Sequence, residues 1–172
     1  MRNICTSLLA VLLAGCSSFK IPRDPNLQIA IAADHGGVKL KEKIVKSLED
    51  SGFKVVDYGT FNDKISVDYP DYAQKVARHV LHTKNSFGIL ICRSGIGMSI
   101  ASNRFKNIRA ALCLSPKMAK SAREHNDANI ICFGADYSNL NSCLNCINIF
   151  INSKFQEGRH LKRINKIEQN FE

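Results

Sequence analysis

Short apolar segments alternate along the chain with longer segments of helical periodicity. Residues 27–33 (LQIAIAA) are apolar and contain β-branched side chains, which is typical of a short buried parallel strand. Leu40, Ile44 and Leu48 then fall on one face of a predicted helix. Gly52 is the stop signal for that helix. The same patterns predict further strands in residues 54–59, 87–92, 108–113 and 128–134, and further helices in residues 68–80, 97–105, 115–125, 139–153 and 158–170.

Five strands that alternate with helices predict an α/β fold, a Rossmann-like doubly wound five-stranded parallel sheet in a three-layer αβα arrangement. At 172 residues the chain is expected to form a single domain that ends in a basic helix. Ligands of such sheets bind beyond the carboxyl ends of the strands. This rule selects the segments ADHGG, CRSGIGMS, SPKM and FGADY.

Cys92 lies at the end of a predicted strand, immediately before a turn that contains Gly95 and Gly97. The helix predicted after this turn directs free backbone amides toward the cleft, and a helix N-terminus favours the thiolate form of a cysteine. A thiolate there is able to act as a base near neutral pH. Cysteine is also among the most frequently buried residues, so Cys92 taken alone is better explained as a core residue than as a base.

Other candidate polar groups have structural explanations as well. Asp34 and His35 follow the first strand, where an aspartate commonly caps a helix. His125 lies at a predicted helix end, a common place for a surface histidine. Arg159 and Arg163 are four residues apart on one helical face, which suits either a phosphate group or a solvated basic helix.

Composition limits the classes of partner. The content of 45% hydrophobic and 23% charged residues is typical of an ordered globular protein. The formal net charge of +9 suits nucleic acid, a membrane surface or a small anionic substrate as the partner. Basic residues do not interleave with aromatic residues, so no nucleic acid partner is expected. A nucleotide-binding domain is also disfavoured, because neither a phosphate loop with lysine nor a complete glycine fingerprint is present.

Residues 1–26 form a separate segment, and the domain is predicted in residues 27–172. The segment has an early cation, an apolar run over residues 8–14 and then Leu-Ala-Gly-Cys16, similar to a bacterial lipoprotein cleavage box. The alternative is an N-terminal extension that is absent or disordered in the working protein. The odd number of cysteines in the domain, five, favours free thiols and a cytoplasmic location, and Cys143 and Cys146 lack a second pair for a zinc site.

Taken together, the motifs resemble the type B ribose-5-phosphate isomerases and their relatives, which include the galactose-6-phosphate isomerase subunits. The resemblance covers residues 28–168 and rests on ADHGG, VDYGT, DYPDYA, GILIC, SGIGMSI, IRAALC, REHNDAN and EGRH. It implies interconversion of D-ribose 5-phosphate and D-ribulose 5-phosphate, in the non-oxidative pentose phosphate pathway, without metal or nucleotide cofactor. It also implies a homodimer or homotetramer whose active sites are shared between subunits.

The resemblance assigns catalytic roles to Cys92 as the base, Ser94 near the sugar oxygens and His125 as the group that opens the furanose ring. The residues expected to bind substrate are Asp34, His35, Arg93, Gly95, Ile96, Gly97, Met98, Ser99, Asn126, Arg159 and Arg163. Gly95 to Ser99 would form the backbone hole for the enediolate, and Arg159 and Arg163 would bind the phosphate.

Two positions depart from the family pattern. Arg93 stands where most relatives have glycine, and Asp136 stands where many have an arginine that reaches the phosphate. Arg93 either lowers the pKa of Cys92 further or crowds the enediolate hole. For the phosphate, either the other arginines suffice or Arg93 substitutes for the missing one. The alternatives to a pentose enzyme are an isomerase of a six-carbon sugar phosphate, such as galactose 6-phosphate or allose 6-phosphate, and a lipid-anchored noncatalytic binding protein.

Overall fold

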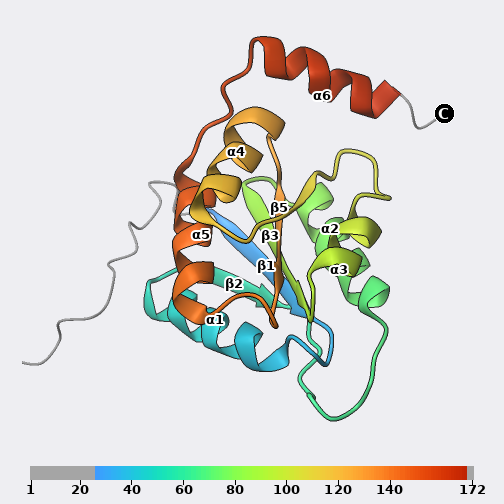
Figure 1. Ribbon diagram of the computed structural model, residues 1–172, viewed down its shortest axis with the longest axis vertical. Helices are drawn as coiled ribbons and strands as arrows, with labels where there is room; N and C mark the ends of the chain where they lie inside the picture. The colour runs from blue at the N-terminus through green and yellow to red at the C-terminus, as the bar shows by residue number, and fades with distance from the viewer. Residues whose placement is uncertain (1–25, 170–172) are drawn as a thin grey trace, which may run out of the picture.

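The computed structural model describes residues 26–169 (Figure 1). The lipoprotein-like segment therefore lies outside the described residues, apart from Asn26. The strands are β1 (Gln28–Ala33), β2 (Lys54–Asp57), β3 (Ser86–Cys92), β4 (Ala110–Leu112) and β5 (Ile130–Gly134). The helices are α1 (Val38–Asp50), α2 (Tyr69–His82), α3 (Ile96–Ser102), α4 (Pro116–Asn126), α5 (Leu140–Asn152) and α6 (Arg159–Gln169).

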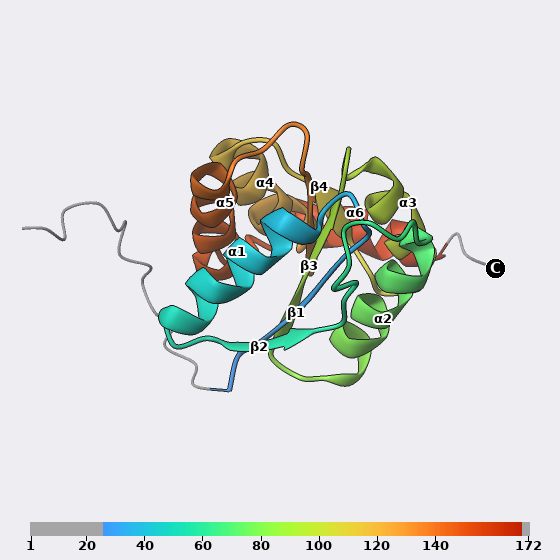
Figure 2. The ribbon, with the colours of Figure 1, turned by 90° about the horizontal axis from the view of Figure 1, so that it is seen from below.

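The five strands form one parallel sheet in the order β2-β1-β3-β5-β4. Helices α1, α4 and α5 cover one face of the sheet, and α2 and α3 cover the other, as Figure 2 shows. The predicted doubly wound, three-layer fold is thus confirmed. The basic C-terminal helix is also present, as α6, which lies beside the end of α4 (Figure 1).

The period-two alternation of side chains divides the core between the two sheet faces. In β3, Ile89 and Ile91 belong to the cluster under α1, α4 and α5, whereas Leu90 and Cys92 belong to the cluster under α2 and α3. Because both faces are covered, the central strands β1, β3 and β5 are mostly buried and almost entirely apolar. This burial explains why apolar segments in the sequence located these three strands, whereas the edge strands β2 and β4 are only partly buried.

The order of the strands reverses at β1, which pairs with β2 on one side and β3 on the other. The loops after β1 and β3 therefore leave the sheet side by side at its carboxyl edge, where doubly wound proteins bind ligands. Ala33, the last residue of β1, is paired with Ile91, which directly precedes Cys92 at the end of β3. Asp34, His35 and the segment from Cys92 onward are consequently neighbours.

Among residues 26–169, no helix is long and apolar enough to cross a lipid bilayer. The same described residues contain no group of three or more histidine, cysteine, aspartate or glutamate side chains arranged to hold a metal ion. The Cys143–Cys146 pair is instead buried in the contact between α5 and the sheet.

Candidate active site

The thiol of Cys92 closes the end of β3 and is held by the turn that follows. Its side chain is only 5% exposed, and the backbone N–H of Gly95 donates to Sγ at 3.0 Å. Gly95 has a φ of +75°, and a Cβ at this position would lie 2.8 Å from the carbonyl carbon of Phe133. A glycine is therefore required for the turn that directs the amide at the sulfur. The sulfur of Cys92 therefore has a backbone hydrogen-bond donor directly beside it.

The first turn of α3 follows directly after this turn and forms the next part of the site. The hydroxyl of Ser94 accepts the N–H of Ile96 at 3.3 Å, which places Ser94 at the start of the helix. Met98 is fully buried, and the hydroxyl of Ser99 donates to the carbonyl of Ala110 at 3.1 Å. The side chains of Met98 and Ser99 thus serve the core and the edge strand, so their contribution to the site is limited to the backbone.

The loop after β1 has a similarly defined geometry. One carboxylate oxygen of Asp34 accepts the N–H groups of Gly36 and Gly37, at 2.9 and 3.2 Å, so Asp34 does fix the turn into α1. Nδ1 of His35 accepts the N–H of Val67 at 3.2 Å. An accepting Nδ1 is unprotonated, so the hydrogen of the neutral ring is on Nε2. His35 therefore presents a hydrogen-bond donor rather than a base.

Arg93 lies at the edge of the site, between the loop after β1 and the loop after β3. Its side chain crosses Gly36, where a Cβ would lie 2.5 Å from Cγ of Arg93. The guanidinium lies 3.9 Å from the carboxylate of Asp136, and both side chains are more than half exposed. The two residues that depart from the family pattern are therefore neighbours. At this distance the pair is an ion pair without a hydrogen bond, and Arg93 keeps donors for an anion.

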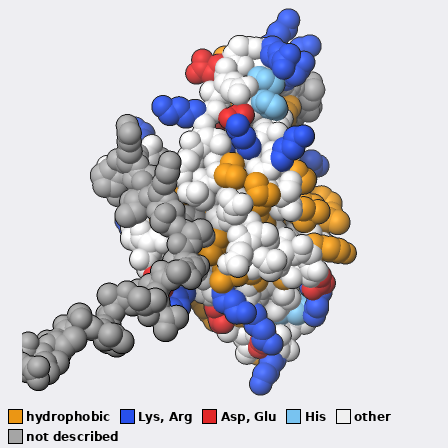
Figure 3. Space-filling model, turned by 60° about the vertical axis from the view of Figure 1, so that its left-hand side comes forward, with side chains coloured by type: hydrophobic (Ala, Val, Ile, Leu, Met, Phe, Trp, Pro, Cys, Tyr) orange, Lys and Arg blue, Asp and Glu red, His pale blue; other side chains and the backbone are white. Residues whose placement is uncertain are grey.

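The remaining predicted residues form a second group. His125 and Asn126 end α4, and the ring of His125 stacks on that of His160 at 4.5 Å and an interplanar angle of 5°. Partial burial lowers the pKa of His160, as do the positive charges of His125, Arg159 and Arg163. His125, His160, Arg159 and Arg163 therefore form one cluster, which is cationic through its two arginines, whereas the lowered pKa of His160 favours the neutral form of that ring. Figure 3 shows histidine side chains among lysine and arginine at the end of the molecule where α6 lies.

Within one chain the two groups do not meet. Helix α4 ends next to the beginning of β5, whereas Cys92 is paired with Gly134 at the end of β5. Four residue steps of strand separate these edges by about 13 Å. Figure 1 shows α6 at the opposite end of the sheet from the carboxyl ends of the strands. The structure thus brings Asp34, His35 and Cys92 together, and separately His125, Asn126, Arg159 and Arg163.

Two residues of these groups were not selected from the sequence. The ring of Tyr69 packs on α3, since a Cβ at Gly97 would lie 2.8 Å from it. His160 stands inside the basic motif GRHLKR, but its partner His125 is distant along the chain. The spacing of Arg159 and Arg163 indicated the helical face, whereas the histidine stack needs the packing of α6 against α4.

The other thiols lack the environment of Cys92. Burial raises the pKa of Cys113 and of Cys143 to about 12, with a further contribution from the neighbouring Cys146. Burial likewise raises the pKa of Cys132 well above its ordinary value. These cysteines remain neutral thiols near pH 7 and behave as small apolar core residues.

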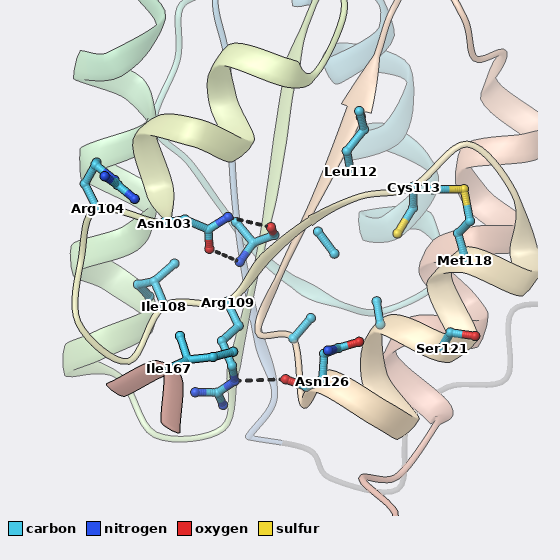
Figure 4. Close-up of a pocket in the computed structure, with 14 residues that line it drawn as sticks. Asn103, Arg104, Ile108, Arg109, Leu112, Cys113, Met118, Ser121, Asn126 and Ile167 are labelled. Carbon is cyan, nitrogen blue, oxygen red and sulfur yellow. Dashed lines mark hydrogen bonds between the residues drawn. The ribbon is translucent and has the colours of Figure 1, made fainter. Parts of the chain in front are cut away.

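A groove of about 560 Å³ runs beside β4, between α3 and α4 (Figure 4). The side chain of Asn103 occupies the free edge of this strand, because it donates to the carbonyl and accepts the N–H of Ala110, both at 2.8 Å. Apolar side chains such as Leu112, Met118 and Ile167 line the groove. This groove is separate from the thiol of Cys92.

A thiol held by an amide at the switch point of a doubly wound sheet defines an α/β protein suited to proton transfer on a small polar ligand. The chain belongs to the Ribose/Galactose Isomerase family, whose model matches residues 29–167. It is similar to the ribose 5-phosphate isomerase B of Anaplasma phagocytophilum, with 47% identity over 81% of this chain and 95% of that chain and a TM-score of 0.76.

Two further solved structures extend this comparison. The ribose 5-phosphate isomerase of Thermotoga maritima is 46% identical, with a TM-score of 0.81 over 83% of this chain and 98% of that chain. The ribose-5-phosphate isomerase B of Mycoplasma genitalium, solved with bound ribulose-5-phosphate, is 37% identical. Its TM-score is 0.78 over 83% of this chain and 95% of that chain.

Proposed function

We propose that this protein is an aldose-ketose isomerase that interconverts D-ribose 5-phosphate and D-ribulose 5-phosphate through an enediolate. The observation that carries the proposal is the Cys92 thiol, held by the N–H of Gly95 at the carboxyl edge between β1 and β3. The likeness to a relative solved with bound ribulose-5-phosphate supports the choice of substrate. A six-carbon sugar phosphate is the second candidate, and kcat/KM for each sugar decides between them.

In this mechanism Cys92 removes the proton from C2 of the open-chain aldose, and the electron pair moves through C1 onto O1. The proton on O2 passes to O1, and Cys92 returns its proton to C1, which gives the ketose with no net gain or loss of atoms. The backbone amides of Gly97 and Met98, in the first turn of α3, stabilise the enediolate, and Nε2–H of His35 is a further donor. Asp34 and Ser94 contact the sugar hydroxyls.

Ring opening requires a second acid–base group, and we assign it to His125 of a neighbouring subunit, with Asn126 on the sugar. Arg159 and Arg163 of the same neighbour bind the phosphate. Within one chain, the group that contains Cys92 lies far from the group that contains His125 and the two arginines. This separation supports the assignment, since the first group has the base for carbon but no ring-opening histidine beside it. Phosphate binding fixes the sugar against Cys92, so that binding energy from the unreactive end contributes to orientation.

Sharing of this kind requires a homodimer, or a homotetramer built from such dimers, and a symmetric interface would complete two sites at once. The groove beside β4, the Met118 side chain that lines it and the Leu114 side chain that follows β4, 43% and 48% exposed, support an interface on this side. This side also carries the end of α4, where His125 and Asn126 lie.

A mixed dimer tests the shared site. Chains with Cys92→Ser and chains with His125→Asn are expected to be almost inactive alone. In a heterodimer purified through two different tags, one site has both changes and the other has none, so we expect about half of the wild-type activity. A heterodimer as inactive as its two parents would contradict the shared site.

We assign Arg93 to the binding of the phosphate, and Asp136 is its ion-pair partner. Arg93→Gly is expected to raise KM for ribose 5-phosphate about tenfold with little change in kcat, because an ionic contact to a distant group binds substrate and transition state equally. Asp136→Asn is expected to lower KM. Lys84→Gly, which removes an exposed cation from the turn before β3, is the control. Unchanged kinetics of Arg93→Gly would exclude this role.

We further propose a cytoplasmic location. The five cysteines of residues 26–169 are all free, which suits a reducing compartment. Recovery of the protein in the membrane fraction, with a lipid on Cys16 detected by mass measurement of the mature N-terminus, would contradict this proposal and favour the lipid-anchored alternative.

A further inference from the structure

Helix α6 is attached to the rest of the molecule through few side chains. Of its residues, His160 and Ile164 are buried, and the others are largely exposed. His160 fixes the first turn by stacking on His125. Because both buried residues lie in the first half of α6, the helix is able to pivot about them, and Arg163 would then move relative to His125. The far end of α6 therefore requires an attachment of its own.

Arg109, just before β4, supplies this attachment. Its Nη1 lies 3.5 Å from the carboxylate of Glu168, in the last turn of α6. The other oxygen of this carboxylate accepts the N–H of Asn107 at 3.0 Å. The side chains of Arg109 and Glu168 are only 18% and 19% exposed. Such a partly buried ion pair with an additional hydrogen bond is screened less by solvent than an exposed pair.

The same guanidinium also holds the end of α4. Nε of Arg109 donates to the carbonyl groups of Asn126 and Asp127, both at 3.0 Å, and Nη2 donates to the carboxylate of Asp127 at 2.8 Å. Figure 4 shows Arg109 reaching Asn126, with Ile167 of α6 beside it. Arg109 is thus a direct link between the backbone next to His125 and the last turn of α6.

Asp127 anchors this link in the core. Its second carboxylate oxygen accepts Nη1 of Arg123 at 2.7 Å. The guanidinium of Arg123 lies against the rings of Phe87 and Phe150, at 4.8 and 5.6 Å. The charges of Arg123, Asp127, Arg109 and Glu168 therefore alternate in sign from the core to α6.

We infer that Arg109 and Glu168 are positioning residues, which set the distance between the ring-opening His125 and the phosphate-binding Arg159 and Arg163. Eight residue steps from His160 to Glu168 separate the two attachments of α6 by about 12 Å. Two attachments at this separation fix the direction of the helix, whereas one does not. This inference rests on the proposed function, because it assigns the cationic cluster to the phosphate of the substrate.

Glu168→Ala tests the inference. We expect KM for ribose 5-phosphate to rise about tenfold, with kcat within about twofold, because a displaced phosphate contact weakens ground state and transition state alike. The inhibition constant of inorganic phosphate should rise by the same factor. Glu168→Gln keeps an acceptor for Asn107 but loses the ion pair, and should have an intermediate effect.

Asp50→Ala is the control, because it removes a carboxylate from an exposed pair with Lys46 on α1. A purely structural role of Glu168 would lower the melting temperature and leave KM and phosphate inhibition unchanged, and this result would overturn the inference. Titration of wild type and Glu168→Ala with inorganic phosphate, followed by ³¹P NMR, measures phosphate affinity independently of isomerase activity. It therefore distinguishes failure of the positioning role from failure of the proposed function. Wild-type protein without isomerase activity would contradict the function, whereas equal phosphate affinity of wild type and Glu168→Ala would contradict the positioning role.

Discussion

Cys92→Ser is expected to lower kcat for the isomerisation of ribose 5-phosphate by about 10³-fold, the contribution typical of a positioned general base. A serine hydroxyl keeps the size of the thiol and its contact with the N–H of Gly95, but it does not ionise near neutral pH. KM should change little, since Cys92 is 5% exposed and the phosphate contacts lie elsewhere. A coupled assay of ketose formation measures both constants.

Hydrogen exchange separates this role from that of His125. Ribulose 5-phosphate has its O5 blocked by the phosphate and so forms no furanose, which means that its C1 proton is removed without ring opening. In D₂O, wild-type enzyme and His125→Asn should both exchange one C1 hydrogen of ribulose 5-phosphate, as observed by ¹H NMR. Cys92→Ser should lose this exchange, although both variants are slow with ribose 5-phosphate.

This pair of variants is its own matched control, because each lacks one proposed acid–base group and retains the other. Exchange in Cys92→Ser at the wild-type rate would show that another group removes the proton. Loss of exchange in His125→Asn would place His125 in the proton transfer at carbon rather than in ring opening. Circular dichroism of both variants checks that the fold is retained.

The predictable part of this molecule is the sheet and its carboxyl edge. Residues 27–33 and 87–92 were recognisable as strands because a strand covered on both faces contains few polar residues. Parallel strands place their carboxyl ends at one edge, so the proximity of Asp34, His35 and Cys92 followed from the fold class alone. Their detailed contacts, such as that of His35 with the N–H of Val67, depend on a long loop without periodicity.

The same rule locates the second group. A helix that connects two parallel strands runs back along the sheet, so its C-terminal residues lie at the amino edge. His125 ends such a helix and is therefore at the opposite edge from Cys92 within its own chain. Short-range patterns do not reveal the link from Arg109 to Glu168, because its partners are 59 residues apart in the sequence.

Lys41 is a charged residue of the core that the sequence analysis did not select. It stands in the segment VKLKEK of α1, where lysines alternate with apolar residues. The structure buries its side chain completely. The ammonium is paired with Asp57 at the end of β2 and lies 4.4 Å from the ring centre of Phe61. Asp57 is the last residue of β2 and Phe61 lies in the loop that follows, so the pattern of residues in α1 does not indicate either partner.

The ion pair of Lys41 and Asp57 supports the site through the loop after β2. Asp57 accepts the N–H of Gly59 at 2.9 Å, and the carbonyl of Gly59 accepts the N–H of Ala33 at 2.7 Å. The N–H of Thr60 donates to the carbonyl of Ala33, also at 2.7 Å. Ala33 is the last residue of β1 and directly precedes Asp34. The pair therefore fixes the backbone from which Asp34 and His35 extend.

Lys41→Met is expected to destabilise the protein by about 3 kcal/mol, because removal of one partner leaves the other charge without compensation in a largely buried place. Methionine retains the length and apolar surface of the lysine stem, so the loss of packing is small. Asp57 is 20% exposed, which places the expected cost at the lower end of the range for buried pairs. Urea unfolding followed by circular dichroism measures the change.

The double variant Lys41→Met, Asp57→Asn decides whether the charge or the shape is responsible. Asparagine keeps an oxygen that can accept the N–H of Gly59 but carries no charge, so most of the stability should return, as when a buried pair is neutralised as a whole. Lys46→Met breaks the exposed pair with Asp50 and should cost less than about 0.5 kcal/mol. A double variant less stable than Lys41→Met would show that the carboxylate of Asp57 stabilises the loop without its lysine.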